Sequence, residues 1–161
     1  FGLFRGLGDV YRSQMKRWIL YIVLGLIVFF IWDNSLQNDV SSDGFSLRIT
    51  QWLSPLLYKF GFTGDVWSLN RIVRKMAHVF EFSVLGGCLY IALHQFNREY
   101  AGLKVIAIGL AIAGLDECLQ LTSVGRNASI RDVAIDTAGV IIGVVIVQLI
   151  LSIYRSFSHK S

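Results

Sequence analysis

Charged residues are scarce in this chain, and their scarcity argues against an ordinary soluble domain. Asp, Glu, Lys and Arg make up 16% of the 161 residues, whereas a soluble domain averages about 25%. Proline occurs only once and glycine 15 times, a balance that argues against disorder and suits close helix packing. The hydrophobic share of 54% predicts a membrane protein with one domain, residues 1–161.

Cysteine is also rare, and the linear motifs of familiar metal and nucleotide sites are missing. Cys88 and Cys118 lie within apolar segments, where a thiol behaves as a small hydrophobe. The sequence has no HExxH, CxxC, P-loop or G-x-S-x-G motif. We therefore predict no disulfide, no metal and no other cofactor.

Basic residues near the N-terminus do not predict a nucleic-acid partner. Arg5, Arg12, Lys16 and Arg17 are accompanied by Asp9 alone. They are too few, and too close to an apolar segment, to form a nucleic-acid patch. Such a stretch is typical of a cytoplasmic anchor.

Four apolar segments predict an all-α integral membrane helical bundle. The first has no A-x-A-like cleavage site after it, so we expect it to be retained as a span rather than removed as a signal peptide. Each segment is long enough to cross a bilayer, the first with help from flanking residues. The expected transmembrane helices are residues 18–34, 76–93, 103–121 and 130–153.

The long link between the first two spans predicts an interfacial helix. Apolar residues recur at helical spacing from Ser46 to Phe60, a pattern typical of an amphipathic helix lying on the membrane surface. A re-entrant segment is the less favoured alternative. Pro55 in the middle of this stretch predicts a break or a kink.

Lysine and arginine in the short loops predict the orientation. With four spans, the N-terminal tail, the link with Arg98 and Lys104, and the C-terminal tail with Arg155 lie on one side, which we expect to be cytoplasmic. The long link and the turn 122–129 then face outward. Four further basic residues weaken this orientation unless they pair with carboxylates: Arg71, Arg74, Lys75 and Arg126.

Polar residues on the last three spans converge on one leaflet. In this topology the second and fourth spans enter from outside and the third leaves outward, so their polar ends coincide. Ionisable groups are costly in lipid and usually face a bundle interior or a water-filled cavity. The predicted ligand-binding residues are Arg74, Lys75, His78, Glu81, Asp116, Glu117, Gln120, Arg126, Arg131, Asp132 and Asp136.

Two interpretations of this convergence remain open. The groups could form a salt-bridged lattice that only holds the bundle together. They could instead line a polar cavity whose arginines bind phosphate and whose carboxylates bind a headgroup or a divalent cation, or act as acid and base. In the acid–base case the candidate catalytic residues are His78, Glu81 and Asp116.

At these residues the sequence resembles the VanZ-like family of bacterial membrane proteins. Three motifs occur in order: R-K-x-x-H-x-x-E from Arg74, D-E-x-x-Q from Asp116, and G-R-x-x-x-I-R-D-V-x-I-D-x-x-G-x-x-x-G from Gly125. They cover the second half of the chain. Val124 stands where relatives often have proline, and Asp136 where many have asparagine.

The resemblance implies a multi-pass protein of the bacterial cytoplasmic membrane. The family is named for a protein that raises resistance to teicoplanin, a lipid-tailed glycopeptide that acts at the outer face of the membrane. We therefore expect an outer-leaflet site that binds a membrane lipid, a cell-wall precursor or the lipoglycopeptide itself, with no reaction catalysed.

Two other functions are ranked below this one. A membrane enzyme could modify a lipid headgroup or a lipid-linked sugar, using His78 and neighbouring carboxylates. A transporter or channel is less favoured, because the charged groups gather at one end of the spans. The sequence leaves open whether the chain forms a homo-oligomer.

Overall fold

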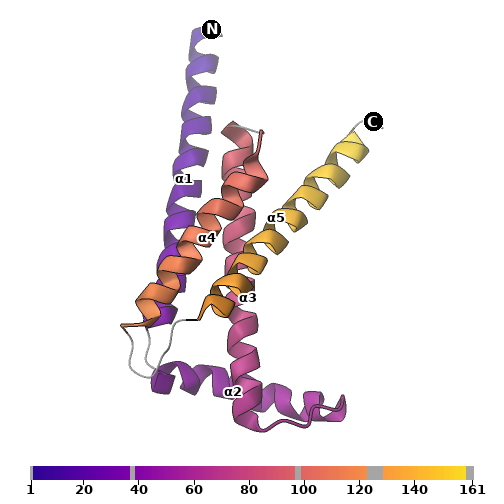
Figure 1. Cartoon of the computed structure of the whole chain (residues 1–161). Helices are drawn as coiled ribbons and strands as arrows, with labels where there is room; N and C mark the ends of the chain where they lie inside the picture. The colour runs from indigo at the N-terminus through magenta and orange to yellow at the C-terminus, as the bar shows by residue number, and fades with distance from the viewer. Residues whose placement is uncertain (1, 37–38, 97–98, 123–128, 159–161) are drawn as a thin grey trace.

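The protein is all-helical in its computed structural model, which describes residues 2–36, 39–96, 99–122 and 129–158. Four helices pack lengthwise against one another, and α2 crosses them at one end (Figure 1). Both chain ends lie at the opposite end of the bundle from α2. The helices are α1 Gly2–Leu36, α2 Asp39–Lys59, α3 Val66–Phe96, α4 Ala101–Gln120 and α5 Ile130–Ser158.

Three of these helices are long and apolar enough to cross a membrane, as expected of a multi-pass membrane protein. They are Arg17–Leu36 in α1, Val66–Gln95 in α3 and Ile130–Ser158 in α5. Helix α4 falls outside this set because its 20 residues include Lys104, Asp116 and Glu117. The all-α prediction is confirmed, whereas a count of four spans stays a prediction.

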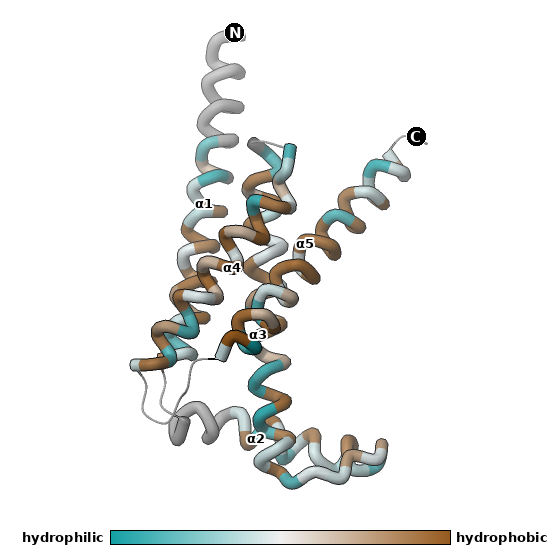
Figure 2. Tube along the Cα trace, in the orientation of Figure 1, coloured by the Kyte–Doolittle hydropathy of each residue, from teal (hydrophilic) through white to brown (hydrophobic). Residues whose placement is uncertain are grey.

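Large apolar side chains on the outer surface fit a lipid environment. Trp18, Ile22, Leu26 and Phe29 are all at least 60% exposed along α1. A contiguous apolar surface of this kind is rare on soluble monomers. Figure 2 shows hydrophobic residues along α4, α5 and the middle of α1, whereas hydrophilic residues are frequent on the part of α3 nearest α2.

Helix α3 begins ten residues before the predicted second span, because a capping residue precedes it. Asp65 accepts a hydrogen bond of 3.1 Å from the backbone N–H of Ser68, as an N-cap side chain does. Hydrogen bonds from Ser68 also lower the pKa of Asp65 below its ordinary value of 3.8. The added turns extend α3 beyond the bundle toward α2 (Figure 1).

Helix α2 continues through Pro55, so the predicted break does not occur. Proline cannot donate a hydrogen bond to the carbonyl four residues earlier, here that of Gln51. The Ser54 hydroxyl donates to that carbonyl instead, at 3.0 Å. On the face toward α3, the buried Thr50 hydroxyl donates to Asn70 Oδ1 at 3.1 Å.

Glycines allow α3, α4 and α5 to approach closely. A Cβ added to Gly139 would lie 2.7 Å from the Val79 carbonyl oxygen on α3. A Cβ added to Gly109 on α4 would lie 2.7 Å from Val140 Cγ2 on α5. Small residues let helix backbones pack in this way in membranes, and the contact buries Phe82 between the helices.

Candidate functional site

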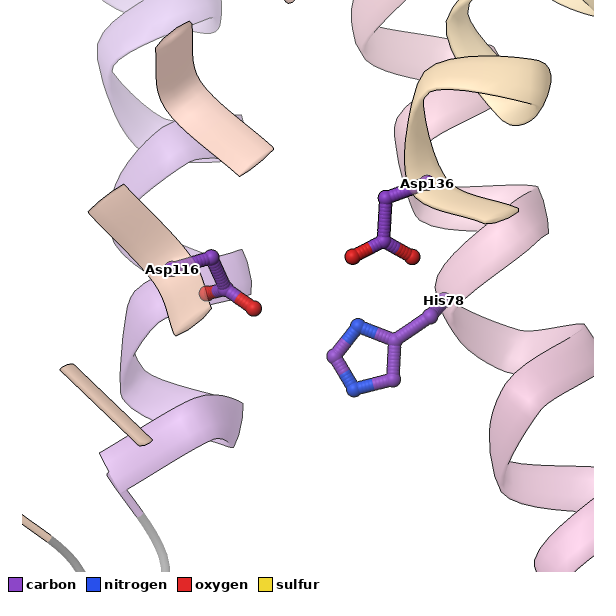
Figure 3. A group of neighbouring side chains, drawn as sticks. All are labelled: His78, Asp116 and Asp136. Carbon is purple, nitrogen blue, oxygen red and sulfur yellow. The ribbon is translucent and has the colours of Figure 1, made fainter. Parts of the chain in front are cut away.

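Three polar side chains from three helices meet inside the bundle. His78 comes from α3, Asp116 from α4 and Asp136 from α5, and Figure 3 shows all three directed toward one shared space. One possible ligand atom of each lies within 4.8 Å of the others. Asp116 and Asp136 are 0% and 3% exposed, whereas His78 is half-buried.

Close backbone packing explains why these side chains meet. Gly139 is one turn after Asp136, and its contact with Val79 on α3 places that turn next to His78. Gly109 admits the side chain of Val140 between α4 and α5 in the same way. Close helix packing therefore begins beside the polar cluster, on its apolar side.

Asp116 is held by its own helix but only through one oxygen. Gln120 lies one turn later and its Nε2 donates to Asp116 Oδ2 at 2.9 Å. The other oxygen, Oδ1, is buried and has no hydrogen-bond partner within the described residues. A buried carboxylate oxygen without a donor is costly, so this atom marks a place where a ligand would be stabilising.

Glu117 connects the end of α4 to the start of α5. Its Oε2 accepts a hydrogen bond of 2.7 Å from the backbone N–H of Ser129, and its side chain is 4% exposed. This bond satisfies one of the backbone donors left open where a helix begins. Glu117 therefore has a structural task in addition to any role in ligand binding.

Glu81 receives a partner from α1 that sequence reasoning did not include. Asn34 Nδ2 donates to Glu81 Oε1 at 3.0 Å, while Glu81 Oε2 is buried with no hydrogen-bond partner in the described part of the chain. The available signal was the position of Asn34 at the outer end of the first predicted span, level with the other polar groups. The sequence analysis also did not include Ser129, whose backbone N–H donates to Glu117.

The basic residues of the predicted site that the structure describes are more exposed than its buried aspartates. Lys75 forms an ion pair with Asp132, and their side chains are 51% and 32% exposed. Lys75 thus pairs with a carboxylate as predicted, whereas Arg71 donates to the Ser68 hydroxyl at 3.1 Å. Arg131 is exposed at the start of α5. Arg74 is half-buried on α3, and Arg126 lies outside the described residues.

An apolar groove of about 500 Å³ opens beside the polar cluster, between α1 and α3. Among the described residues that line it, Glu81 is the only polar one. The groove therefore places an apolar surface next to the half-buried carboxylate of Glu81. Its lining residues are Val23, Leu26, Ile27, Phe29, Phe30, Ile31, Phe80, Glu81 and Val84.

Comparison with known proteins gives a family and no individual relative. No curated protein and no solved structure matches the chain. The sequence profile of the VanZ/LLP1 family matches residues 17–151, which includes α3, α4 and all three residues of the buried cluster. The matched region exceeds half of the chain, so this protein belongs to the VanZ/LLP1 family.

Proposed function

We propose that the protein binds a lipid or lipid-linked molecule at the outer leaflet of the bacterial cytoplasmic membrane. The headgroup enters the polar cluster and the hydrocarbon tail lies in the groove between α1 and α3. The observation that carries this proposal is the double position of Glu81, which lines the apolar groove and has a buried oxygen without a hydrogen-bond partner among the described residues.

The proposed topology has four membrane spans, with α4 as the third. Its 20 residues extend about 30 Å, the thickness of the hydrocarbon core. Asp116 and Glu117 are buried against neighbouring helices, so their charge does not meet lipid. Lys104 lies near the other end of α4, where a long side chain reaches the interface. An even number of spans agrees with both chain ends lying at one end of the bundle.

In this topology both termini are cytoplasmic and α2 lies on the outer membrane surface. Three large apolar side chains of the α2 region support the interfacial position: Trp52 is 78% exposed, Phe60 81% and Leu56 54%. The opposite side of α2, with Thr50, packs on α3. Insertion of this apolar face into the headgroup region would remove it from water.

The charges of the site fit a headgroup of mixed character. Glu81, Asp132 and Asp136 would accept hydrogen bonds from hydroxyl or amine groups. Lys75 and Arg74 would interact with phosphate or carboxylate. A lipid, a cell-wall precursor and the tail-bearing glycopeptide teicoplanin share this combination of an apolar chain and a polar head. Retention of any of them at the outer leaflet would be expected to reduce teicoplanin susceptibility.

Drug susceptibility in a sensitive Gram-positive host tests the proposal. We expect the wild-type protein to protect against teicoplanin but not against vancomycin, which has no lipid tail. Glu81→Gln and Asp132→Asn should lose that protection at matched membrane levels. Glu99→Gln is the matched control, because Glu99 is exposed in the α3–α4 link at the opposite end of the bundle.

The variants separate a functional site from a lattice that only supports the fold. Protection retained by both site variants would contradict ligand binding through these carboxylates. If the wild-type protein gives no protection, this chain has no role in teicoplanin resistance. Binding of radiolabelled phospholipid to the purified protein would then test whether the groove holds a hydrocarbon tail.

A second candidate function is an enzyme that modifies a lipid headgroup. The observation in its favour is the proximity of His78 to Asp116 and Asp136, which suits acid–base chemistry. Turnover of a defined lipid that disappears in His78→Ala would favour this function. Identical lipid profiles with and without the protein would exclude it.

A further inference from the structure

Three ligand atoms from three helices occupy one small volume. A nitrogen of His78 and one carboxylate oxygen each of Asp116 and Asp136 lie within 4.8 Å of one another (Figure 3). Ligands of a tetrahedral zinc ion sit about 2.0–2.2 Å from the metal and therefore about 3.3 Å apart. Side-chain rotations would have to draw the three atoms together to that spacing. We propose that His78, Asp116 and Asp136 bind a divalent transition-metal ion, Zn²⁺.

A second observation points to a ligand at the same place. Asp116 is fully buried, and its Oδ1 has no hydrogen-bond donor within the residues that the structure describes. Its Oδ2 accepts a hydrogen bond from Gln120, so Oδ1 is the oxygen left without a partner. A metal ion supplies the positive partner that this oxygen lacks.

The charge of the cluster also fits a divalent cation. Asp116 and Asp136 are both buried, and two carboxylates this close repel each other in a medium of low dielectric constant. One doubly charged ion neutralises both. A neutral imidazole completes the set through a nitrogen without adding charge.

The donor atoms select among metals. Mg²⁺ and Ca²⁺ prefer sites made of oxygen alone, whereas imidazole favours zinc and its neighbours. No thiolate takes part, because Cys118 is exposed on α4 and Cys88 lines a separate apolar groove between α3 and α5. Among ions that accept this mixed set, zinc binds more tightly than manganese.

The arrangement resembles an open site more than a closed one. Three protein ligands leave at least one coordination position for water or another ligand. His78 is half-buried, so the ion can enter. The hydrogen bond from Gln120 orients the carboxylate of Asp116, as groups outside the coordination sphere commonly orient metal ligands.

Zinc binding to the purified full-length chain tests the inference. The protein is solubilised in detergent, treated with chelator, desalted and titrated with ZnCl₂ by calorimetry, with bound metal counted by mass spectrometry. We expect one Zn²⁺ per chain, with Mg²⁺ unable to compete. Asp116→Asn and Asp136→Asn should weaken binding by more than about 100-fold, and Gln120→Ala by about 10–100-fold.

Two matched controls exclude binding elsewhere. His94→Ala removes another histidine of α3, and Glu99→Gln removes an exposed carboxylate in the α3–α4 link; both should keep wild-type zinc affinity. Wild-type protein that takes up no zinc overturns the inference, as does uptake that Asp116→Asn and Asp136→Asn leave unchanged. The titration uses lipid-free micelles, so its result is independent of the proposed lipid binding.

A measurement on the wild-type protein keeps the inference testable if the asparagine variants fail to fold. The X-ray absorption spectrum of the zinc complex should show one imidazole and oxygen ligands. A sulfur ligand or two imidazoles would overturn the assignment.

Discussion

The backbone of Gly143 on α5 lies directly against the carbonyl oxygen of Ser83 on α3, so even a methyl group at position 143 would overlap that oxygen. The Gly87 backbone nitrogen would be only 2.8 Å from the same methyl group. Both obstacles are backbone atoms, which cannot rotate away. Gly143→Ala should therefore destabilise the protein by about 1–3 kcal/mol or more through overpacking, measured by thermal unfolding in detergent.

Glycine-to-alanine changes in open space provide the control for this prediction. A Cβ at Gly114 on α4 or at Gly25 on α1 meets no atom within 4 Å. Alanine is favoured over glycine within a helix by about 1 kcal/mol, so these two variants should be neutral or slightly stabilised. Equal stability of Gly143→Ala and Gly114→Ala would show that α3 and α5 are not in close contact.

The ion pair of Lys75 and Asp132 should contribute little to stability. Both side chains are substantially exposed, and exposed pairs are typically worth about 0–1 kcal/mol. A double-mutant cycle with Lys75→Gln and Asp132→Asn should give a coupling energy below about 1 kcal/mol in unfolding experiments. A coupling well above that value would support the lattice interpretation of the polar residues over the ligand-binding one.

Helix α2 should loosen when its buried hydrogen bond to α3 is removed. Thr50→Val preserves the side-chain shape but removes the donor to Asn70 Oδ1. Loss of one partner of a buried hydrogen bond costs about 1–3 kcal/mol. Hydrogen exchange of the α2 amides should become faster, whereas Thr50→Ser should retain near-wild-type protection. The same exchange rates in both variants would argue against this contact.

The first turn of α3 should depend on pH through Asp65. Hydrogen bonds from Ser68 lower the pKa of Asp65 below 3.8, so the charged cap is complete at neutral pH. Its contribution is lost as the pH falls below about 3.8 and through the folded-state pKa. Amides of residues 66–69 should exchange faster in Asp65→Ala at neutral pH. Asp65→Asn, which still caps but does not titrate, should lack the acid-induced loss.

Much of the fold could be predicted because apolar length and helical spacing are local properties. The all-α class and the apolar helices α1, α3 and α5 follow from residue patterns. Helix starts were harder, since α3 begins at Val66 through a cap at Asp65. A prediction from hydropathy follows the apolar, lipid-crossing part of a helix. It therefore placed the beginning of the second span at residue 76, ten residues after the start of α3.

For the site, the sequence by itself determined that polar groups on three helices share one level of the bundle. Periodicity along a helix defines a face but not the neighbour that this face meets. Only the tertiary structure decided that His78 meets Asp116 and Asp136, that Lys75 pairs with Asp132, and that Asn34 reaches Glu81. The physical reason is that glycine contacts set the rotation and depth of α3, α4 and α5 relative to one another, and these contacts join residues far apart in the chain.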